Sequence, residues 1–142
     1  MKYKQNNISP KVTFKSNKGI IKQSQSLFSD LKILALDDNK LNLKYYGNLF
    51  KNVFLFSEPS MAIREIKKND YDIIILEYFF QKCTGLDILN EIQKEKTNKE
   101  LVSLLITNSN LGISYGALNS FTSYLFKPVA PREIYDEINL IL

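Results

Sequence analysis

Five short runs of apolar residues, set apart by more polar segments, constrain the fold of this chain more than any other feature. Each run is rich in β-branched or aromatic residues, which is typical of a strand buried on both faces of a sheet. All are much too short to cross a bilayer, so no membrane span is expected. The runs are Ile33–Leu36, Val53–Phe56, Ile73–Leu76, residues 101–106 and residues 124–126.

The segments between these runs have the spacing of amphipathic helices. In the first segment Leu41, Tyr45 and Leu49 recur four residues apart, and Tyr46 and Phe50 widen the same stripe. This stripe predicts a helix that packs against the sheet. The four later segments place their apolar stripes at Ala62, Ile63 and Ile66 after Pro59, at Leu86, Leu89 and Ile92, within residues 111–118, and at Ile134, Ile138 and Ile141 after Pro131.

The alternation of strands and helices predicts one α/β domain. Strand–helix–strand units connect by right-handed crossovers, so the strands become parallel and helices cover both faces of the sheet. Five such units in about 110 residues predict a flavodoxin-like fold. We therefore expect a doubly wound five-stranded parallel sheet in the order 2-1-3-4-5, with five helices.

The composition changes near residue 30. Residues 1–30 contain six lysines and one acid, whereas the rest of the chain carries a net charge of −1, which leaves +4 for the whole. This contrast predicts a basic polar extension over residues 1–30 and a folded domain over residues 31–142. A small hairpin or strand is predicted within the extension. The residues that predict it are Val12, Phe14 and the pair Ile20 and Ile21, which lie on the two sides of an Asn-Lys-Gly turn. Widely spaced lysines do not favour nucleic-acid binding, although a contact through this basic segment stays an alternative.

The absence of histidine removes many kinds of chemistry. Without histidine there is no His-based general base, no Ser-His or Cys-His pair and no His-ligated zinc. The single cysteine, Cys83, allows neither an internal disulfide nor a cysteine metal cluster. The N-terminal residues lack the apolar segment of a signal peptide. We therefore expect a cytoplasmic protein that is not an enzyme.

Polar residues follow four of the five apolar runs at the point where each strand is expected to end. Asp37 and Asp38 follow the first run, Glu77 the third, Thr107 the fourth and Lys127 the fifth. The carboxyl ends of parallel strands meet at one edge of the sheet, where ligands of such folds bind. These side chains are therefore expected to form one polar site.

This set of residues resembles the receiver domain of two-component response regulators, of the chemotaxis-regulator type, over residues 31–142. The Tyr-Asp-hydrophobic segment 71–77 and the Gly-Leu-Asp segment from residue 85 stand at the family's spacing from the phosphoacceptor. The resemblance implies a role for each residue. Asp37 and Asp38 match the acidic pair, Glu77 the phosphoacceptor, Thr107 the switch hydroxyl, Tyr124 the switch aromatic, Lys127 the lysine of the fifth strand, and Asn42 an asparagine common in the first helix.

Glu77 departs from the family, which has an aspartate at this position. Its carboxylate lies one methylene further from the backbone, and phosphoryl transfer depends on placement to about 1 Å. We expect slow or absent phosphorylation and a carboxylate that reaches Thr107 or Lys127, as a partial mimic of the phosphorylated state. The alternative is a degenerate receiver that serves as a constitutive scaffold or docking module. Two further features depart from the family's pattern: the residues Phe80 and Gln81, and the segment between Thr107 and Lys127, which is shorter than the family's usual segment by about two residues.

Three predicted neighbours, Asp37, Asp38 and Glu77, are carboxylates, which repel one another unless a cation joins them. They form a weak Mg²⁺ site, or Lys127 supplies the counter-charge instead. No other cofactor is expected. The resemblance implies a signalling partner, either a histidine kinase or a downstream effector. It also implies a homodimer through the face formed by the fourth helix, the fifth strand and the fifth helix.

Overall fold

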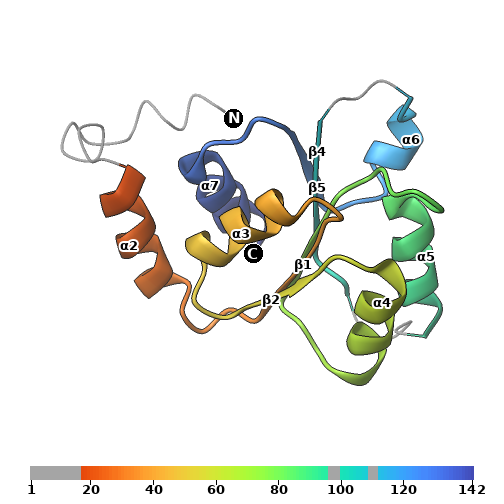
Figure 1. Ribbon diagram of the computed structural model, residues 1–142, viewed down its shortest axis with the longest axis horizontal. Helices are drawn as coiled ribbons and strands as arrows, with labels where there is room; N and C mark the ends of the chain where they lie inside the picture. Colours follow the sequence, from red (N-terminus) through yellow and green to blue (C-terminus); the bar gives the residue numbers. More distant parts are fainter. Residues whose placement is uncertain (1–16, 96–99, 109–111) are drawn as a thin grey trace.

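The computed structural model describes residues 17–95, 100–108 and 112–142 and contains a five-stranded parallel sheet (Figure 1). The strands are β1 (Ile33–Leu36), β2 (Val53–Phe56), β3 (Ile73–Leu76), β4 (Ser103–Thr107) and β5 (Ser123–Phe126). Their order is β2-β1-β3-β4-β5, which confirms the predicted fold class and order. β1 lies between β2 and β3, with Ile33 opposite both Val53 and Ile73. All five carboxyl ends therefore meet at one edge.

Helices cover both faces of the sheet (Figure 1). They are α2 (Asn17–Leu27), α3 (Lys40–Leu49), α4 (Pro59–Lys68), α5 (Gly85–Glu95), α6 (Tyr115–Leu118) and α7 (Pro131–Ile141). α3 and α7, with α2 outside them, cover one face, and α4, α5 and α6 cover the other. The described residues thus contain six helices where five were predicted, and none of the six has the length and apolar character of a membrane-crossing helix.

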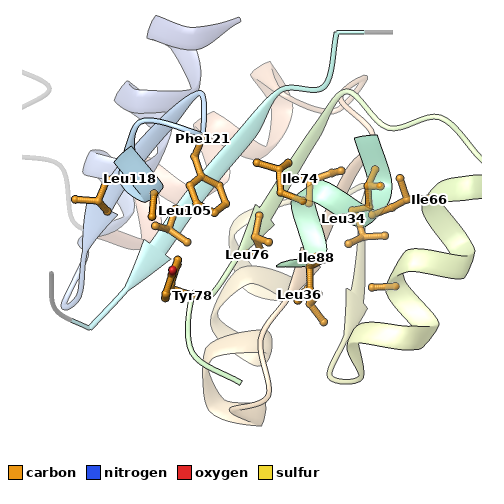
Figure 2. Close-up of a cluster of buried hydrophobic side chains, with 14 of the residues drawn as sticks. Leu34, Leu36, Ile66, Ile74, Leu76, Tyr78, Ile88, Leu105, Leu118 and Phe121 are labelled. Carbon is orange, nitrogen blue, oxygen red and sulfur yellow. The ribbon is translucent and has the colours of Figure 1, made fainter. Parts of the chain in front are cut away.

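The core is divided by the sheet into two apolar clusters. Alternate residues of a strand point to opposite faces. Leu34 and Leu36 of β1 therefore join the cluster beneath α4 and α5, where Figure 2 shows them beside Ile74 and Leu76 of β3. Ile33 joins the second cluster, beneath α3 and α7. Burial on both sides explains why β1 and β3 are continuous apolar runs.

The two outer strands differ from the prediction that every run is buried on both faces. β1, β3 and β4 are buried throughout, but β2 and β5 form the edges of the sheet and are only partly covered. Phe54 and Leu55 are each 41% exposed, and Phe126 is 38% exposed. The prediction of full burial was wrong for these strands because an edge strand lacks a neighbour on one side.

The segment that precedes β1 is helical, so the predicted hairpin or strand around Ile20 and Ile21 is wrong. Ile20, Ile21 and Phe28 pack against the second cluster, and the Phe28 ring stacks on Tyr135 of α7 with centroids 5.8 Å apart. The Gln25 side chain donates a hydrogen bond of 2.6 Å to the carbonyl of residue 48 at the end of α3. Residues 17–27, which composition assigned to the extension, thus pack on the domain. Val12 and Phe14 lie outside the described residues.

Two helical predictions need correction. Leu41 does not belong to the buried stripe of α3, because it is 77% exposed while Leu43, Tyr46 and Leu49 face the core. Tyr46, Leu49 and Phe50 of the predicted stripe are buried, but the buried residues of α3 recur three apart, so Leu43 takes the place that the spacing of four gave to Leu41. Of the predicted helix within residues 111–118, residue 111 lies outside the described residues, and residues 112–118 contain only the four helical residues of α6. Ser114 caps its first turn by accepting from the Ala117 N–H.

Candidate functional site

Lys127 joins two carboxylates at the carboxyl edge of the sheet. Its Nζ lies 2.8 Å from Oε2 of Glu77 and 2.9 Å from Oδ2 of Asp37. The three side chains are 13%, 6% and 2% exposed, respectively, so the group is nearly enclosed. The Lys127 N–H also donates to the Thr107 carbonyl at 2.7 Å, which continues the pairing of β5 with β4 and aims the lysine at the site. The predicted convergence of strand-end residues is therefore present for Asp37, Glu77 and Lys127.

Asp37 is held by the turn between β1 and α3. Its Oδ1 accepts from the Asn39 N–H at 2.8 Å, and its Oδ2 accepts from the Asn42 side-chain amide at 3.1 Å. Asn39 is in turn the N-cap of α3, since its side chain accepts from the N–H groups of Leu41 and Asn42. Asp and Asn favour such caps because their short side chains reach backbone N–H groups. The capping turn and the site are thus built from the same residues.

Glu77 is held by the loop that follows β3. Its Oε1 accepts from the Tyr78 N–H at 2.6 Å and more weakly from the Phe79 N–H at 3.4 Å, which leaves Oε2 for Lys127. The loop returns so closely that the Gly85 N–H donates to the Tyr78 carbonyl at 2.6 Å. A Cβ on Gly85 would lie 2.5 Å from the Glu77 carbonyl oxygen. Only glycine therefore allows α5 to begin here.

The site carries one negative charge in excess, because two carboxylates face one ammonium. Burial tends to lower the pKa of Lys127, but the hydrogen bonds that it donates to Glu77 and Asp37, and the charges of these carboxylates, raise that pKa above its ordinary value of 10.5. Lys127 is therefore charged at neutral pH. The pKa of Tyr46, on α3 beside the site, is also raised, mainly by burial and further by Asp37 and Glu77.

In the part of the chain that the structure describes, the Lys127 side chain is bonded to none of the other predicted side chains, Asp38, Thr107 and Tyr124. Asp38 is exposed and lines a separate hollow of about 310 Å³ with Glu58 and Gln81. Thr107 is fully buried, and its Oγ1 has no hydrogen-bond partner among the described residues. Tyr124 is half-buried, with its ring 5.6 Å from that of Phe126. The expectation that Glu77 reaches Thr107 or Lys127 therefore holds for Lys127 and not for Thr107.

The predicted Mg²⁺ site does not fit this arrangement. Among residues 17–95, 100–108 and 112–142, no group of three or more acidic, cysteine or histidine side chains is placed to hold a metal ion. Asp38 is exposed, and the Lys127 ammonium joins the other two carboxylates. The counter-charge is therefore supplied by Lys127, which was the stated alternative to a cation.

Sequence reasoning missed two contributors to the site. The backbone N–H groups of Tyr78 and Phe79 fix Glu77, and no side-chain pattern signals a backbone donor. Tyr46 was read only as a core residue of the helical stripe. Tyr46, however, lines a cavity together with Lys127. A tyrosine among leucines on a buried stripe was the available signal, because a buried hydroxyl needs a partner.

The sequence profile of the response regulator receiver domain matches residues 33–139, from the start of β1 into α7. The chain belongs to the receiver domain family. This receiver is 26% identical over 120 residues to the alkaline phosphatase synthesis transcriptional regulatory protein PhoP of Bacillus subtilis, covering 78% of the chain and 48% of that protein. It is 24% identical over 132 residues to the hybrid signal transduction histidine kinase G of Dictyostelium discoideum, covering 87% of the chain and 4% of that protein. It spans less than half the length of either relative.

Solved receiver structures have the same fold. The CheY-like receiver domain from Methylobacillus flagellatus superposes with a TM-score of 0.70 at 14% identity, over 79% of this chain and 98% of that one. A receiver domain protein from Clostridium thermocellum gives 0.68 at 26% identity, over 78% of this chain and 93% of that one. The chain is thus a receiver domain of two-component response regulator type, and α2 precedes the region that the family profile covers.

Proposed function

We propose that this chain is an atypical receiver that acts by protein–protein contact and does not accept a phosphoryl group in the usual way. The contact between Glu77 and Lys127 carries this proposal. The longer acid is already bonded to the ammonium and to the Tyr78 N–H, so both of its oxygens are engaged. An attacking carboxylate must instead be free and aligned with the incoming phosphorus.

The same contact makes Glu77 a partial mimic of the phosphorylated state. One carboxylate supplies a single charge and two oxygens, where a phosphoryl group supplies nearly two charges and three oxygens. Glu77 accepts a hydrogen bond from Lys127, whereas Thr107 Oγ1 has no hydrogen-bond partner among the described residues. The unpartnered Thr107 hydroxyl favours the second candidate, a receiver that serves as a fixed scaffold without a switch.

The first experiment measures phosphorylation directly. The wild-type chain, Glu77→Asp and Glu77→Ala are incubated with acetyl phosphate and Mg²⁺, and intact-protein mass spectrometry records any added phosphoryl group. We expect none on the wild type or on Glu77→Ala, and some on Glu77→Asp, whose carboxylate returns to the usual depth. A phosphorylated wild type would disprove the proposal, whereas an unreactive Glu77→Asp would favour the fixed scaffold.

We propose that the partner is a signalling protein, either a histidine kinase or a downstream effector, and that the two meet in the cytoplasm. In this proposal the chain itself has no enzymatic role. The likeness to a hybrid histidine kinase supports a phosphorelay setting. A second copy is the other proposed partner, through the face of α6, β5 and α7, where Tyr115, Phe126 and Leu140 are 77%, 38% and 41% exposed. Affinity capture with wild type, Glu77→Asp and Glu77→Ala tests whether binding depends on Glu77, and sedimentation equilibrium tests the dimer.

A further inference from the structure

A cavity of about 380 Å³ lies beside the Lys127 network, between α3, the end of β4 and the loop from β5 to α7. This volume is within the range of small-molecule sites. The cavity is lined by three apolar residues, Ile106, Val129 and Ile134, and by two aromatic residues, Tyr45 and Tyr46. A mostly apolar cavity with a few polar groups is the usual composition of a ligand site.

Three polar groups at this cavity have unused hydrogen-bonding capacity. Tyr46 is 3% exposed, and its hydroxyl has no partner among the described residues, whereas the neighbouring Tyr45 hydroxyl donates to the Val129 carbonyl at 2.7 Å. Lys127 uses two of its three N–H groups on Asp37 and Glu77. The Asn108 amide, at the exposed end of β4, also lines the cavity. These groups therefore offer donors and acceptors to an occupant of the cavity.

The local charge selects against ionised occupants. The network of two carboxylates and one ammonium has one negative charge in excess, so an anion would be repelled by Asp37 and Glu77, which are bonded to Lys127 of the cavity wall. A cation would have to approach the Lys127 ammonium, which lines the cavity itself. The free groups offer O–H and N–H donors together with hydroxyl and amide oxygens as acceptors.

We propose that this cavity binds a small, flat, uncharged ring that carries a carbonyl oxygen and an N–H group. The ring lies against the apolar and aromatic wall, and its polar group meets Tyr46, Asn108 and the third N–H of Lys127. Because Lys127 also holds Glu77, occupancy of the cavity is coupled to the network at the strand ends. This site goes beyond the proposed function and does not rest on it, since binding is measured whether or not Glu77 accepts a phosphoryl group.

The test compares three probes of one shape: benzamide, which is neutral, benzoate, which is an anion, and benzamidine, which is a cation. Each is titrated into the ¹⁵N-labelled full chain while amide shifts are recorded. We expect benzamide to shift the amides of Asn42, Asn108 and Val129 and to bind at least threefold more tightly than the other two. The amides of Tyr78 and Phe79, which contact Glu77 but do not line the cavity, should also shift.

Matched variants separate the cavity from general effects on the fold. Tyr46→Phe should weaken benzamide binding at least threefold. Tyr135→Phe is the control, because that buried hydroxyl already donates to the Leu49 carbonyl at 2.7 Å and does not line the cavity. Asn108→Ala, at the exposed end, provides a second test if Tyr46→Phe lowers the unfolding midpoint. The proposal would be overturned if benzamide shifted no amide at the cavity or if a charged probe bound more tightly than benzamide. It would also be overturned if Tyr46→Phe and Tyr135→Phe weakened benzamide binding equally.

Discussion

The Nζ of Lys127 lies 2.8 Å from Oε2 of Glu77, so a residue that follows the edge strand β5 contacts one that follows β3, two strands away. The same ammonium reaches Asp37 after β1, at 2.9 Å. Three strands that are not all neighbours are thereby tied together at one edge of the sheet. Glu77 supplies one of the two carboxylates that hold the ammonium in a nearly enclosed position.

Lys127→Met should destabilise the domain strongly. It leaves Asp37 and Glu77 buried and close together without their counter-charge, and breaking a buried pair by removing one partner costs about 3–5 kcal/mol. Urea unfolding monitored by circular dichroism gives the change in the free energy of unfolding.

Lys67→Met is the matched control for this substitution. Lys67 lies 3.2 Å from Glu95 and 4.0 Å from Glu91, but both acids are about half exposed. Surface ion pairs contribute about 0–1 kcal/mol, so the control should change stability by no more than that. Equal losses in the two variants would show that the Lys127 network contributes no more than a surface pair.

The stability of the wild type should fall at high pH partly through Lys127. Because the folded-state pKa of this lysine lies above its ordinary value of 10.5, its contribution is fully present below pH 10.5 and is lost as pH rises through the folded value. Burial also raises the pKa of Tyr46 and raises that of Tyr135 to about 12, which acts in the same direction. The difference in unfolding free energy between wild type and Lys127→Met measures the contribution of the lysine alone. This difference should become smaller above pH 10.5. A difference that widens there would contradict the assignment.

The fold followed from sequence because β1 and β3 are buried on both faces and therefore read as unbroken apolar runs. The positions of Asp37, Glu77 and Lys127 followed from the rule that parallel strands end at one edge. Asp38 could not be placed in the same way, since the turn after β1 decides which of two adjacent acids points inward. That choice depends on the Asn39 N–H, which donates to Asp37.

The helix before β1 was the largest error, and its cause is the low hydrophobicity of the segment. Only Ile20, Ile21 and Phe28 supply its contacts with the second cluster, so periodicity was too weak to separate a helix from a hairpin. Its stability comes from packing on α3 and α7 rather than from helix propensity. Contacts of this kind join segments distant in the chain and leave no local signal.

Gly85→Ala should disturb the loop that carries Glu77. The added Cβ would lie 2.5 Å from the Glu77 carbonyl oxygen and 3.2 Å from the Tyr78 Cα, and backbone cannot yield as a flexible side chain does. Overpacking of this kind costs about 1–3 kcal/mol. Urea unfolding measures the loss, and the ¹⁵N shift of the Tyr78 amide reports whether its bond to Glu77 has moved.

Gly116→Ala provides the comparison within α6. A Cβ there meets only the Ser114 Oγ, at 4.0 Å, so there is room for the methyl group. Alanine is the better helix former by about 1 kcal/mol, so this variant should be neutral or slightly more stable. Destabilisation of Gly116→Ala as large as that of Gly85→Ala would mean that the close approach at Gly85 is not the cause.

Phe28→Ala tests whether α2 is an integral part of the domain. Phe28 follows α2 and stacks on Tyr135 of α7, so its removal should loosen the helix and lower the free energy of unfolding by about 1–3 kcal/mol. Leu27→Ala, at the neighbouring position, is the control, because Leu27 is 72% exposed and should change stability by less than about 0.5 kcal/mol. Amide hydrogen exchange should show faster exchange across residues 20–27 in Phe28→Ala only. Exchange of the α2 amides in the wild type at the rate of an unfolded peptide would show that α2 is not part of the packed domain. In that case Phe28→Ala and Leu27→Ala should be equally stable.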